Sequence, residues 1–383
     1  MSELVKEKGL DRYIRKLYKN FHRIPEKSYE EYETAKLVAE ELRKIGLEVE
    51  EKIAGTGVVG RQKTGNPGPV IALRADMDAL CLIRNHQETV QHLCGHDAHM
   101  AMVLGAAKML VKTPPPMGEI VYLFQPSEEK LDGARKVIES GALDDVEEMI
   151  GIHVRPENEM ATGDATPALL HGAVQIIRAE IFGKNAHGAR PHLGVNALEA
   201  AVLAVNALNT LHFDPGIPHS AKVTRLLVEG DTYNQIPETA EIHVDIRAQC
   251  NALMRTMTVD ISKAIDKSAG ALGAKTIIDT VDHTLAAEYD DDVVKSVGEA
   301  IKGVLGDVLP PLVTFGSEDF HFYSSHKKIK TAYIGLGAGV KPGLHHPAFR
   351  LHPGMLVKGS RILAESVCKR IHQYACTQES GTI

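Results

Sequence analysis

Short apolar runs recur along the chain, and polar residues follow each of them at once. Uninterrupted apolar runs of this kind are typical of strands that are buried on both faces of a parallel sheet. In open α/β sheets, ligands bind outside the carboxyl ends of such strands. The polar segments are therefore expected to meet at one edge of a sheet. The four pairs are Val70–Leu73 before Arg74–Asp78, Ile120–Phe124 before Gln125–Glu129, Met149–Ile152 before His153, and Thr331–Leu336 before Gly337–Gly339 and then His345.

Helical patterns separate these runs. Residues 28–45 carry apolar positions at helical spacing, and Gly46 stands where a C-cap is expected. His99–Val111 is apolar on nearly all sides, which predicts a buried helix. Asp290–Leu305 and Met355–Tyr374 are amphipathic and are expected to cover the sheet. Strands that alternate with helices in this way predict an α/β fold.

The middle third of the chain has a different order of elements. Strand, helix, strand, strand, helix and strand follow one another, which is the order of a ferredoxin-like unit. We therefore predict an α/β domain over residues 1–169 and 285–383, interrupted by an inserted α+β domain over 170–284. The inserted elements are expected at Val174–Phe182, Asn196–Leu211, Lys222–Val228, Ala240–Ala248, Asn251–Leu272 and Lys275–Val281.

Length and composition narrow the class of protein. A chain of 383 residues is too long for one ordinary core, so two domains are expected. A net charge of −7 without a basic run argues against nucleic acid as a partner. The absence of an apolar stretch of about 18 residues argues against a membrane span, and the charged start predicts no signal peptide. Five scattered cysteines fit a reducing cytoplasm better than a disulfide framework.

Two polar segments hold residues that suit a metal site. Cys94 and His96 are two positions apart, so they would converge on one ion from a loop or from the start of a helix. A thiolate combined with imidazoles favours zinc or another transition metal over magnesium or calcium. Because a buried cysteine and a hydrogen-bonded histidine are common without a metal, this pair alone is a weak signal. Glu128–Glu129, His153 and His345 at other strand ends strengthen it.

The adjacent carboxylates Glu128 and Glu129 suggest a division of labour. Successive side chains point in different directions, so one can bind an ion while the other faces water. A divalent ion lowers the pKa of a water that it binds towards about 7, and a carboxylate nearby can take that proton. Asp76 could accept a hydrogen bond from a ligating histidine or could hold the strand end. His99 has a similar choice between supporting a ligand and capping a buried helix.

The inserted domain offers candidates of lower specificity. Ala186–His192 is expected to be a loop, and His187 in it could stabilise an oxyanion or lie on an ordinary surface loop. Asn234 and Arg247 are polar residues near a strand pair. Arg247 could hold a substrate carboxylate or could pair with a neighbouring acid.

Seven motifs in this order resemble one enzyme family. The chain is similar to the metal-dependent amidohydrolases that include hippurate hydrolase, plant indole-acetyl-amino-acid hydrolases and bacterial N-acyl-amino-acid deacylases, which are relatives of aminoacylase and carboxypeptidase G. Within that family it most resembles the bacterial AmhX-type amidohydrolases. The resemblance runs from about His22 to the C-terminus. The motifs are Arg74–Leu80, Cys94–His99, Gln125–Glu129, Gly151–Val154, Ala186–His192, Gly316–Phe320 and Leu344–Pro347.

The resemblance implies a fold and a set of roles. It implies an α/β/α metallopeptidase-like catalytic domain with an inserted ferredoxin-like lid, and a homodimer that forms through the lid. It also implies two divalent ions, zinc or manganese or a similar ion such as cobalt or nickel. The general base would be Glu128, and His187 would stabilise the oxyanion, reaching the partner subunit's site in a dimer. The implied ligands are Cys94, His96, Glu129, His153 and His345.

Three functions follow as hypotheses. The main one is hydrolysis of an N-acyl amino acid or a similar small amide, with Arg247 or Asn234 holding the substrate carboxylate. A dipeptidase or carboxypeptidase would use the same two ions on a peptide bond. An inactive relative that only binds metal is the third, and the intact set of ligands and base argues against it. Cys81, where relatives carry proline, and the short stretch Cys81–Leu93 bear on the substrate range.

Overall fold

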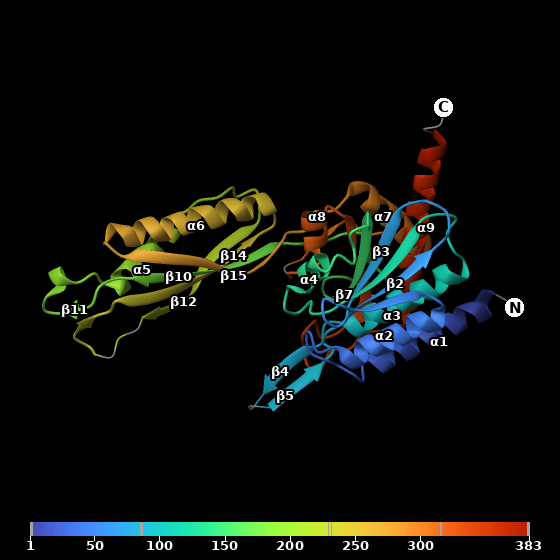
Figure 1. The fold of residues 1–383 in the computed structure, drawn as a ribbon, viewed down its shortest axis with the longest axis horizontal. Coiled ribbons are helices and arrows are strands. Elements are labelled where there is room, and N and C mark those ends of the chain that lie inside the picture. Colours follow the sequence, from blue (N-terminus) through green and yellow to red (C-terminus); the bar gives the residue numbers. More distant parts are fainter. Residues whose placement is uncertain (1–2, 85–86, 229, 231, 315, 381–383) are drawn as a thin grey trace. The chain divides into compact units, whose positions relative to one another are not determined.

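The chain forms two compact units in the computed structural model, which describes residues 3–84, 87–228, 230, 232–314 and 316–380 (Figure 1). The first unit comprises Met1–Leu169, Glu288–Val313 and Asp319–Ile383. The second comprises Leu170–Ala287 and Thr314–Glu318. The assignment of a catalytic role to the first unit and a lid role to the second stays a prediction.

A seven-stranded sheet forms the centre of the first unit, in the order β1-β2-β6-β3-β7-β17-β8. The pairs β3–β6, β3–β7 and β7–β17 are parallel, and the flanking pairs are antiparallel. The four apolar runs are therefore confirmed as the adjacent parallel strands at the middle of a sheet. The bounds are β1 (Glu48–Ile53), β2 (Gly57–Lys63), β3 (Val70–Asp76), β6 (Glu119–Gln125), β7 (Glu148–Pro156), β8 (Ala165–Thr166) and β17 (Lys330–Val340).

Helices cover this sheet, which makes the first unit an α/β domain. The helix α3 packs on β3 and β7 and is itself covered by α1 and α9, while α7 packs on β17 and α9. The short helices α4 and α8 contact each other and pack on β6 and β17. The bounds are α1 (Glu3–Phe21), α2 (Tyr32–Ile45), α3 (His96–Lys112), α4 (Gly133–Glu139), α7 (Asp291–Leu305), α8 (His321–Lys327) and α9 (Leu356–Ser380).

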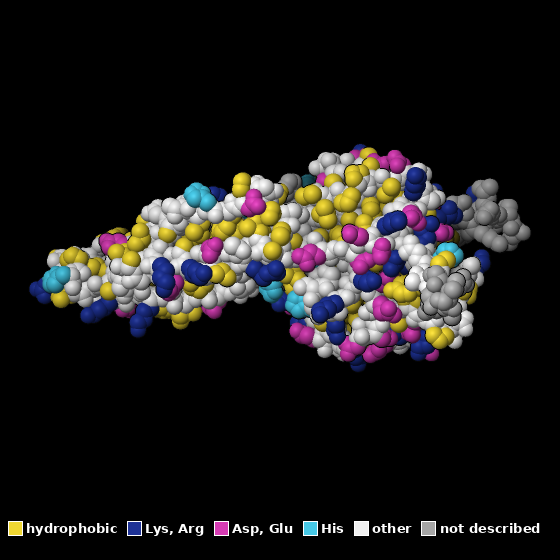
Figure 2. Space-filling view, turned by 90° about the horizontal axis from the view of Figure 1, so that it is seen from above, with side chains coloured by type: hydrophobic (Ala, Val, Ile, Leu, Met, Phe, Trp, Pro, Cys, Tyr) yellow, Lys and Arg dark blue, Asp and Glu magenta, His cyan; other side chains and the backbone are white. Residues whose placement is uncertain are grey.

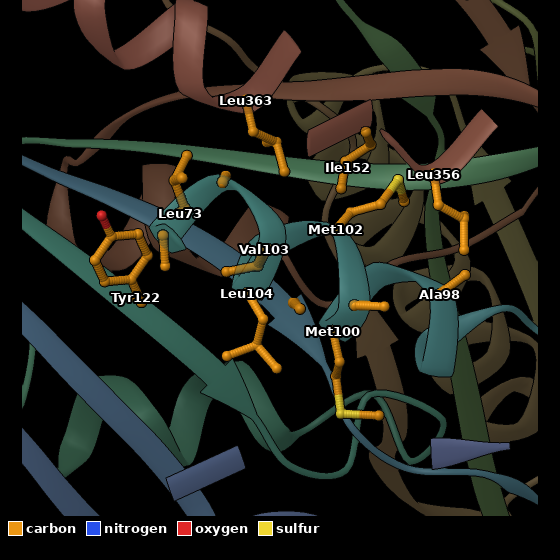
Figure 3. Close-up of a cluster of buried hydrophobic side chains, with 14 of the residues drawn as sticks. Leu73, Ala98, Met100, Met102, Val103, Leu104, Tyr122, Ile152, Leu356 and Leu363 are labelled. Carbon is orange, nitrogen blue, oxygen red and sulfur yellow. The ribbon is translucent and has the colours of Figure 1, made fainter. Parts of the chain in front are cut away.

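The apolar segment that predicted a buried helix is confirmed as α3. Met102 and Ala98 of this helix lie near Ile152 and Leu356, and the cluster includes Leu363 (Figure 3). Gly105 allows the close approach of α1 and α9, because a Cβ atom there would come within 2.4 Å of the Ser360 hydroxyl and 2.7 Å of an Ile14 methyl. The helix therefore fixes its own first turn, which starts at His96, against the sheet.

The second unit has the predicted ferredoxin-like order of elements. Its four-stranded antiparallel sheet has the order β12-β14-β10-β15, and α5 and α6 pack on it and on each other. The buried residues of these elements form a hydrophobic core of their own. The bounds are β10 (Ala173–Phe182), α5 (Ala197–Leu208), β12 (His219–Val228), β14 (Thr239–Ala248), α6 (Asn251–Ala271) and β15 (Lys275–Thr284).

Several elements were not anticipated from the sequence. The stretch after Ala79, expected only to be short, forms the hairpin β4 (Leu80–Arg84) and β5 (Gln87–Gln91). The segment predicted as a loop around His187 contains the two-residue strand β11 (Ala186–His187), which pairs with β13 (Gln235–Ile236). No helix of the described part of the chain is long and apolar enough to cross a membrane. The remaining short elements are β9 (Leu169–His171), β16 (Leu312–Thr314), η1 (Pro191–Leu193) and η2 (Pro353–Met355).

Candidate metal centre

Five predicted ligands come from four segments of the first unit and meet at the carboxyl edge of its sheet. Cys94 and His96 flank the start of α3, Glu129 lies in the turn after β6, His153 lies in β7, and His345 follows β17. The junction before α3 requires glycine. Gly95 has φ +100°, and a Cβ atom there would come within 2.5 Å of a Val154 methyl. The Cys-Gly-His spacing therefore places a thiol and an imidazole on either side of a sharp bend.

The ligand atoms of these side chains lie within a few ångströms of one another. The Cys94 sulfur is 3.5 Å from His153 Nε2 and 3.4 Å from His345 Nε2. Glu129 Oε1 is 3.5 Å from His345 Nε2 and 3.9 Å from His96 Nε2. Two overlapping groups could each hold an ion, one of Cys94, His96 and His153, the other of Cys94, Glu129 and His345.

Hydrogen bonds orient two of the imidazoles. His96 Nδ1 lies 2.9 Å from the Asp78 carbonyl oxygen, and His153 Nδ1 lies 2.6 Å from the Val154 carbonyl oxygen. Because a carbonyl oxygen can only accept, each Nδ1 carries the proton and donates it. In its neutral form, each ring therefore turns the lone pair of its Nε2 towards the cluster, as histidine ligands of metals usually do.

The buried charges and lone pairs of the cluster favour the binding of a cation. His96 Nε2 and Glu129 Oε1 are buried, and no described residue gives either atom a hydrogen bond. Burial raises the pKa of the Cys94 thiol, and Glu129 raises it further. The nearby Cys94 sulfur and Glu129 carboxylate, both of which favour a charged imidazole, raise the pKa of His345 to about 10, so a proton there offsets the negative charge. A divalent ion bound by these donors would neutralise the same charges, and their sulfur, nitrogen and oxygen atoms suit zinc or a similar transition metal.

Glu128 lies beside the predicted ligands, next to Glu129. Its Oε2 is 3.7 Å from His96 Nε2, and the side chain is buried. The carboxylate of Asp78 accepts hydrogen bonds from both backbone N–H groups of this pair, at 3.1 Å from Glu128 and 3.0 Å from Glu129. Asp78 thus holds the turn of Glu128 and Glu129 and also contacts His96. It thereby joins the turn after β6 to the start of α3.

The structure settles the alternatives for Asp76 and His99. Asp76 accepts a hydrogen bond from His99 Nδ1 at 2.7 Å and pairs with Arg74 at 2.7 Å. His99 Nε2 accepts a hydrogen bond from the Val154 backbone N–H at 3.0 Å. With both nitrogens engaged, His99 has no lone pair left for an ion and holds α3 against β7. Asp78, rather than Asp76, supports the Nδ1 atom of His96.

Sequence reasoning missed several buried residues that support the site. Arg74 donates to Gln125 and Asp319 as well as to Asp76, and so ties the ends of β3 and β6 together. Glu31, fully buried at the start of α2, accepts a hydrogen bond from the Ser127 backbone N–H at 2.9 Å. The position of Arg74, directly after an apolar run, could have indicated that it supports the site. Glu31 had no such signal, because its partner lies far away in the sequence.

The predicted residues of the second unit lie at two ends of its sheet. Ala186–His187 pairs with Gln235–Ile236, and the Asn234 carbonyl oxygen accepts a hydrogen bond from Gly188 N–H at 2.7 Å. His187 and Asn234 are therefore neighbours, beyond the end of β14 where Thr239 pairs with Phe182. Arg247 lies at the other end of β14, where it is half exposed and pairs with Asp245 at 2.9 Å. Of the two alternatives given for Arg247, the structure shows the pairing with a neighbouring acid.

Comparison with known proteins assigns the chain to a family. Residues 72–369 match the model of Peptidase family M20/M25/M40, and the protein belongs to this family. N-acetyl-L-cysteine deacetylase of Bacillus subtilis is 30% identical over 93% of this chain and 88% of its own length. Thermostable carboxypeptidase 1 of Saccharolobus solfataricus is 33% identical over 88% of this chain and 89% of its own length.

A solved structure is similar across both units. A crystal structure of a Bacillus subtilis protein, described as a dinuclear metal binding peptidase of the M20 family, has a TM-score of 0.81. It is 26% identical and covers 95% of this chain and 99% of its own chain. Together with the candidate ligand groups, this likeness defines the protein as a metal-dependent hydrolase of amide bonds that binds divalent metal.

Proposed function

We propose that the protein hydrolyses the amide bond of N-acyl amino acids or of similar small amides. The observation that carries this proposal is the convergence of five ligand side chains around two buried atoms, His96 Nε2 and Glu129 Oε1, that have no hydrogen bond among the described residues. A further carboxylate, that of Glu128, lies beside them. The similarity to a deacetylase of an N-acyl amino acid supports the choice of substrate class.

The ligands in this proposal are the predicted ones. Bound divalent ions would supply positive charge that polarises an amide carbonyl and makes water a nucleophile near neutral pH. Zinc or manganese is proposed, with cobalt or nickel as substitutes, and the thiolate argues most for zinc. Two ions fit the two overlapping groups of candidate ligands. The residues that would hold them are Cys94, His96, Glu129, His153 and His345.

Glu128 is the proposed general base. Its carboxylate lies next to the cluster, with Oε2 3.7 Å from His96 Nε2. It would take a proton from the attacking water and pass it to the nitrogen of the leaving amine. Asp78 holds the backbone of this turn, so the carboxylate keeps its position during both transfers. General base catalysis of this kind contributes roughly 10²- to 10⁴-fold to a rate.

His187 is the proposed donor to the oxyanion. Its Nδ1 accepts a hydrogen bond from the Ala189 backbone N–H at 3.0 Å, so the neutral ring carries its proton on Nε2. The side chain is exposed and can present this N–H to a carbonyl oxygen that gains charge. Asn234, its neighbour across the short strand pair, would bind the substrate beside it.

Arg247 is the proposed partner of the substrate carboxylate. Eight residues of β14 separate it from Thr239, at the end of the sheet near His187, which corresponds to roughly 27 Å along an extended strand. Arg247 and His187 of one subunit would therefore serve different sites. That separation supports a homodimer in which the lid of one subunit completes the site of its partner.

Exposed apolar side chains of the second unit support the same dimer. Leu198, Val202 and Leu203 of α5 are 39%, 47% and 37% exposed, and β12 is an edge strand of its sheet. Hydrophobic side chains also reach the surface among the charged ones (Figure 2). An apolar helix face next to an open sheet edge is suited to pairing with a second copy. The five free cysteines support a reducing, cytoplasmic location.

A peptidase is the second candidate function. The similarity to a thermostable carboxypeptidase favours it, because the same residues could act on a peptide bond. An inactive metal-binding relative is the third, and the complete set of ligands and base argues against it.

The test is release of free amino acid from a panel of N-acetyl, N-benzoyl and indole-acetyl amino acids after loading with zinc, manganese or cobalt. A dipeptide panel runs beside it, and Glu128→Ala is the control. We expect metal-dependent turnover of the acyl panel that the substitution abolishes while metal remains bound. Preferred turnover of dipeptides would favour the peptidase. Near-normal turnover in Glu128→Ala would rule out the proposed base.

A further inference from the structure

A small cavity lies in the first unit beside the loop that carries His345. Its volume is about 120 Å³. For scale, an engineered apolar cavity of roughly 150 Å³ admits benzene. Its polar walls come from His22, Gln91 and His92, and its apolar walls include Pro25, Pro347 and Phe349. None of these residues belongs to the proposed catalytic or ligand set.

His92 is the unusual member of this wall. The side chain is 2% exposed, and no described residue gives either of its ring nitrogens a hydrogen bond. Leaving a buried polar group without a hydrogen bond destabilises the folded protein. An imidazole carries at least one N–H whatever its charge, so His92 offers a donor to a molecule in the cavity. A buried side chain of this kind points to a ligand rather than to a simple packing role.

His22 adds positive charge to the same cavity. Its Nδ1 donates a hydrogen bond to the buried carboxylate of Asp97 at 2.7 Å. This hydrogen bond raises the pKa of His22 against the opposing effect of partial burial. The rings of His22 and His92 are stacked with centroids 6.5 Å apart. Asp97 is engaged by His22, and no acidic residue is among those that line the cavity, so the donors there face no competing carboxylate.

We propose that this cavity binds a small carboxylate with a short apolar tail. His22, His92 and the Gln91 amide would donate to the carboxylate, and Pro347 and Phe349 would cover the tail. The volume limits the ligand to an acid of a few carbon atoms. An acid of this class is what hydrolysis of a short N-acyl amino acid releases, so the identity of the physiological ligand rests on the proposed function.

The cavity is connected to the metal-binding segments through its walls. Leu93, which lines it, precedes Cys94, and the Leu93 carbonyl oxygen accepts a hydrogen bond from the His345 backbone N–H at 2.8 Å. Pro347 and Phe349 belong to the loop that carries His345. A ligand in the cavity would therefore contact both segments that bring Cys94 and His345 together, and would slow the release of ions from the site.

The test measures binding without turnover. The full-length chain carrying Glu128→Ala is titrated with acetate, propionate and butyrate, with propionamide as the uncharged match. Binding is followed by calorimetry and by the ring resonances of His22 and His92, with metal loaded and after chelation. We expect saturable binding of the acids but not of the amide, also in the chelated protein, because the metal site cannot bind a carboxylate without ions.

Variants locate the binding. His92→Phe and, separately, His22→Gln should each weaken binding of propionate by about tenfold. Bound propionate should also lower the rate at which a chelator removes the ions. His22→Gln keeps the test decisive if His92→Phe does not fold. Binding seen only with metal loaded, or binding unchanged in both variants, would overturn the proposal, as would the absence of any shift at His92. Because no step needs turnover, failure here would leave the proposed amide hydrolysis standing.

Discussion

The two units present their candidate residues in opposite states. In the first unit, His96 and Glu129 are buried and keep one atom each without a hydrogen bond among the described residues. In the second unit, His187 is exposed, and Arg247 is half exposed with its guanidinium paired to Asp245. The candidate residues of the first unit therefore include buried atoms that lack a hydrogen bond. Those of the second unit are exposed to solvent or paired with a neighbouring charge.

This difference separates two ways of building a site. Buried ligand atoms without hydrogen bonds define a location by themselves, because a bound cation removes the cost of leaving them unpaired. Exposed hydrogen-bond donors do not define a site by themselves. They can act only on a substrate that other residues hold next to them. Substitutions of the predicted ligands in the first unit should therefore abolish metal binding, whereas substitutions of His187 or Arg247 in the second should change catalysis or substrate binding and leave metal binding intact.

The largest effect is expected at Cys94. Cys94→Ala removes a donor shared by both candidate ligand groups, so metal-dependent activity should vanish. With metal at a thousandfold excess over its Kd, the wild type should gain about 4 kcal/mol of stability that the variant lacks. Thermal unfolding with and without chelator measures this gain. Cys81→Ala, at an exposed cysteine of the hairpin, is the matched control, and an equal loss there would contradict the assignment.

A smaller effect is expected at His187. His187→Ala should lower kcat by roughly 10²- to 10³-fold, the cost of losing one oxyanion donor. The metal content and the unfolding temperature should stay unchanged, because the side chain is exposed and lies in the second unit. His192→Ala, a few residues along the same exposed segment, serves as control. Loss of metal in His187→Ala would contradict the expectation that candidate residues of the second unit do not affect metal binding.

Arg247 should affect binding of substrate rather than chemistry. Arg247→Ala should raise KM by about tenfold with little change in kcat, which corresponds to one charge-assisted hydrogen bond. Asp245→Asn frees the guanidinium from its ion pair and should not raise KM. An unchanged KM in Arg247→Ala would show that the arginine serves only the ion pair with Asp245.

The smallest effect concerns His22 and stability. The hydrogen bond to Asp97 raises the pKa of His22 above its ordinary value of 6.5. Its contribution to stability is therefore fully present below pH 6.5 and is lost as the pH rises through the raised value. Because His22 is half exposed, the contribution should stay below about 1 kcal/mol. Urea unfolding of wild type and His22→Gln across this range measures it, and parallel curves would contradict the assignment.

The pattern of the sequence predicted the strand ends well and their supporting contacts poorly. Apolar runs with polar residues behind them marked β3, β6, β7 and β17 correctly, because burial on both faces leaves a local signature. Asp78 could not be ranked above Asp76, since its role depends on the fold bringing the turn of Glu128 to within 3.1 Å. The hairpin of β4 and β5 was missed because its strands are short and mostly exposed, and so carry no such signature.

Asp78 has a consequence for how ions enter the protein. Its carboxylate accepts hydrogen bonds from Glu128, Glu129 and Ser28, and its carbonyl oxygen accepts one from His96. The segments after β3, before α3 and after β6 are thus held together by hydrogen bonds of the chain itself. Loading should then need no refolding, and its rate should rise in proportion to metal concentration, limited by dehydration of the ion and not by rearrangement of the chain.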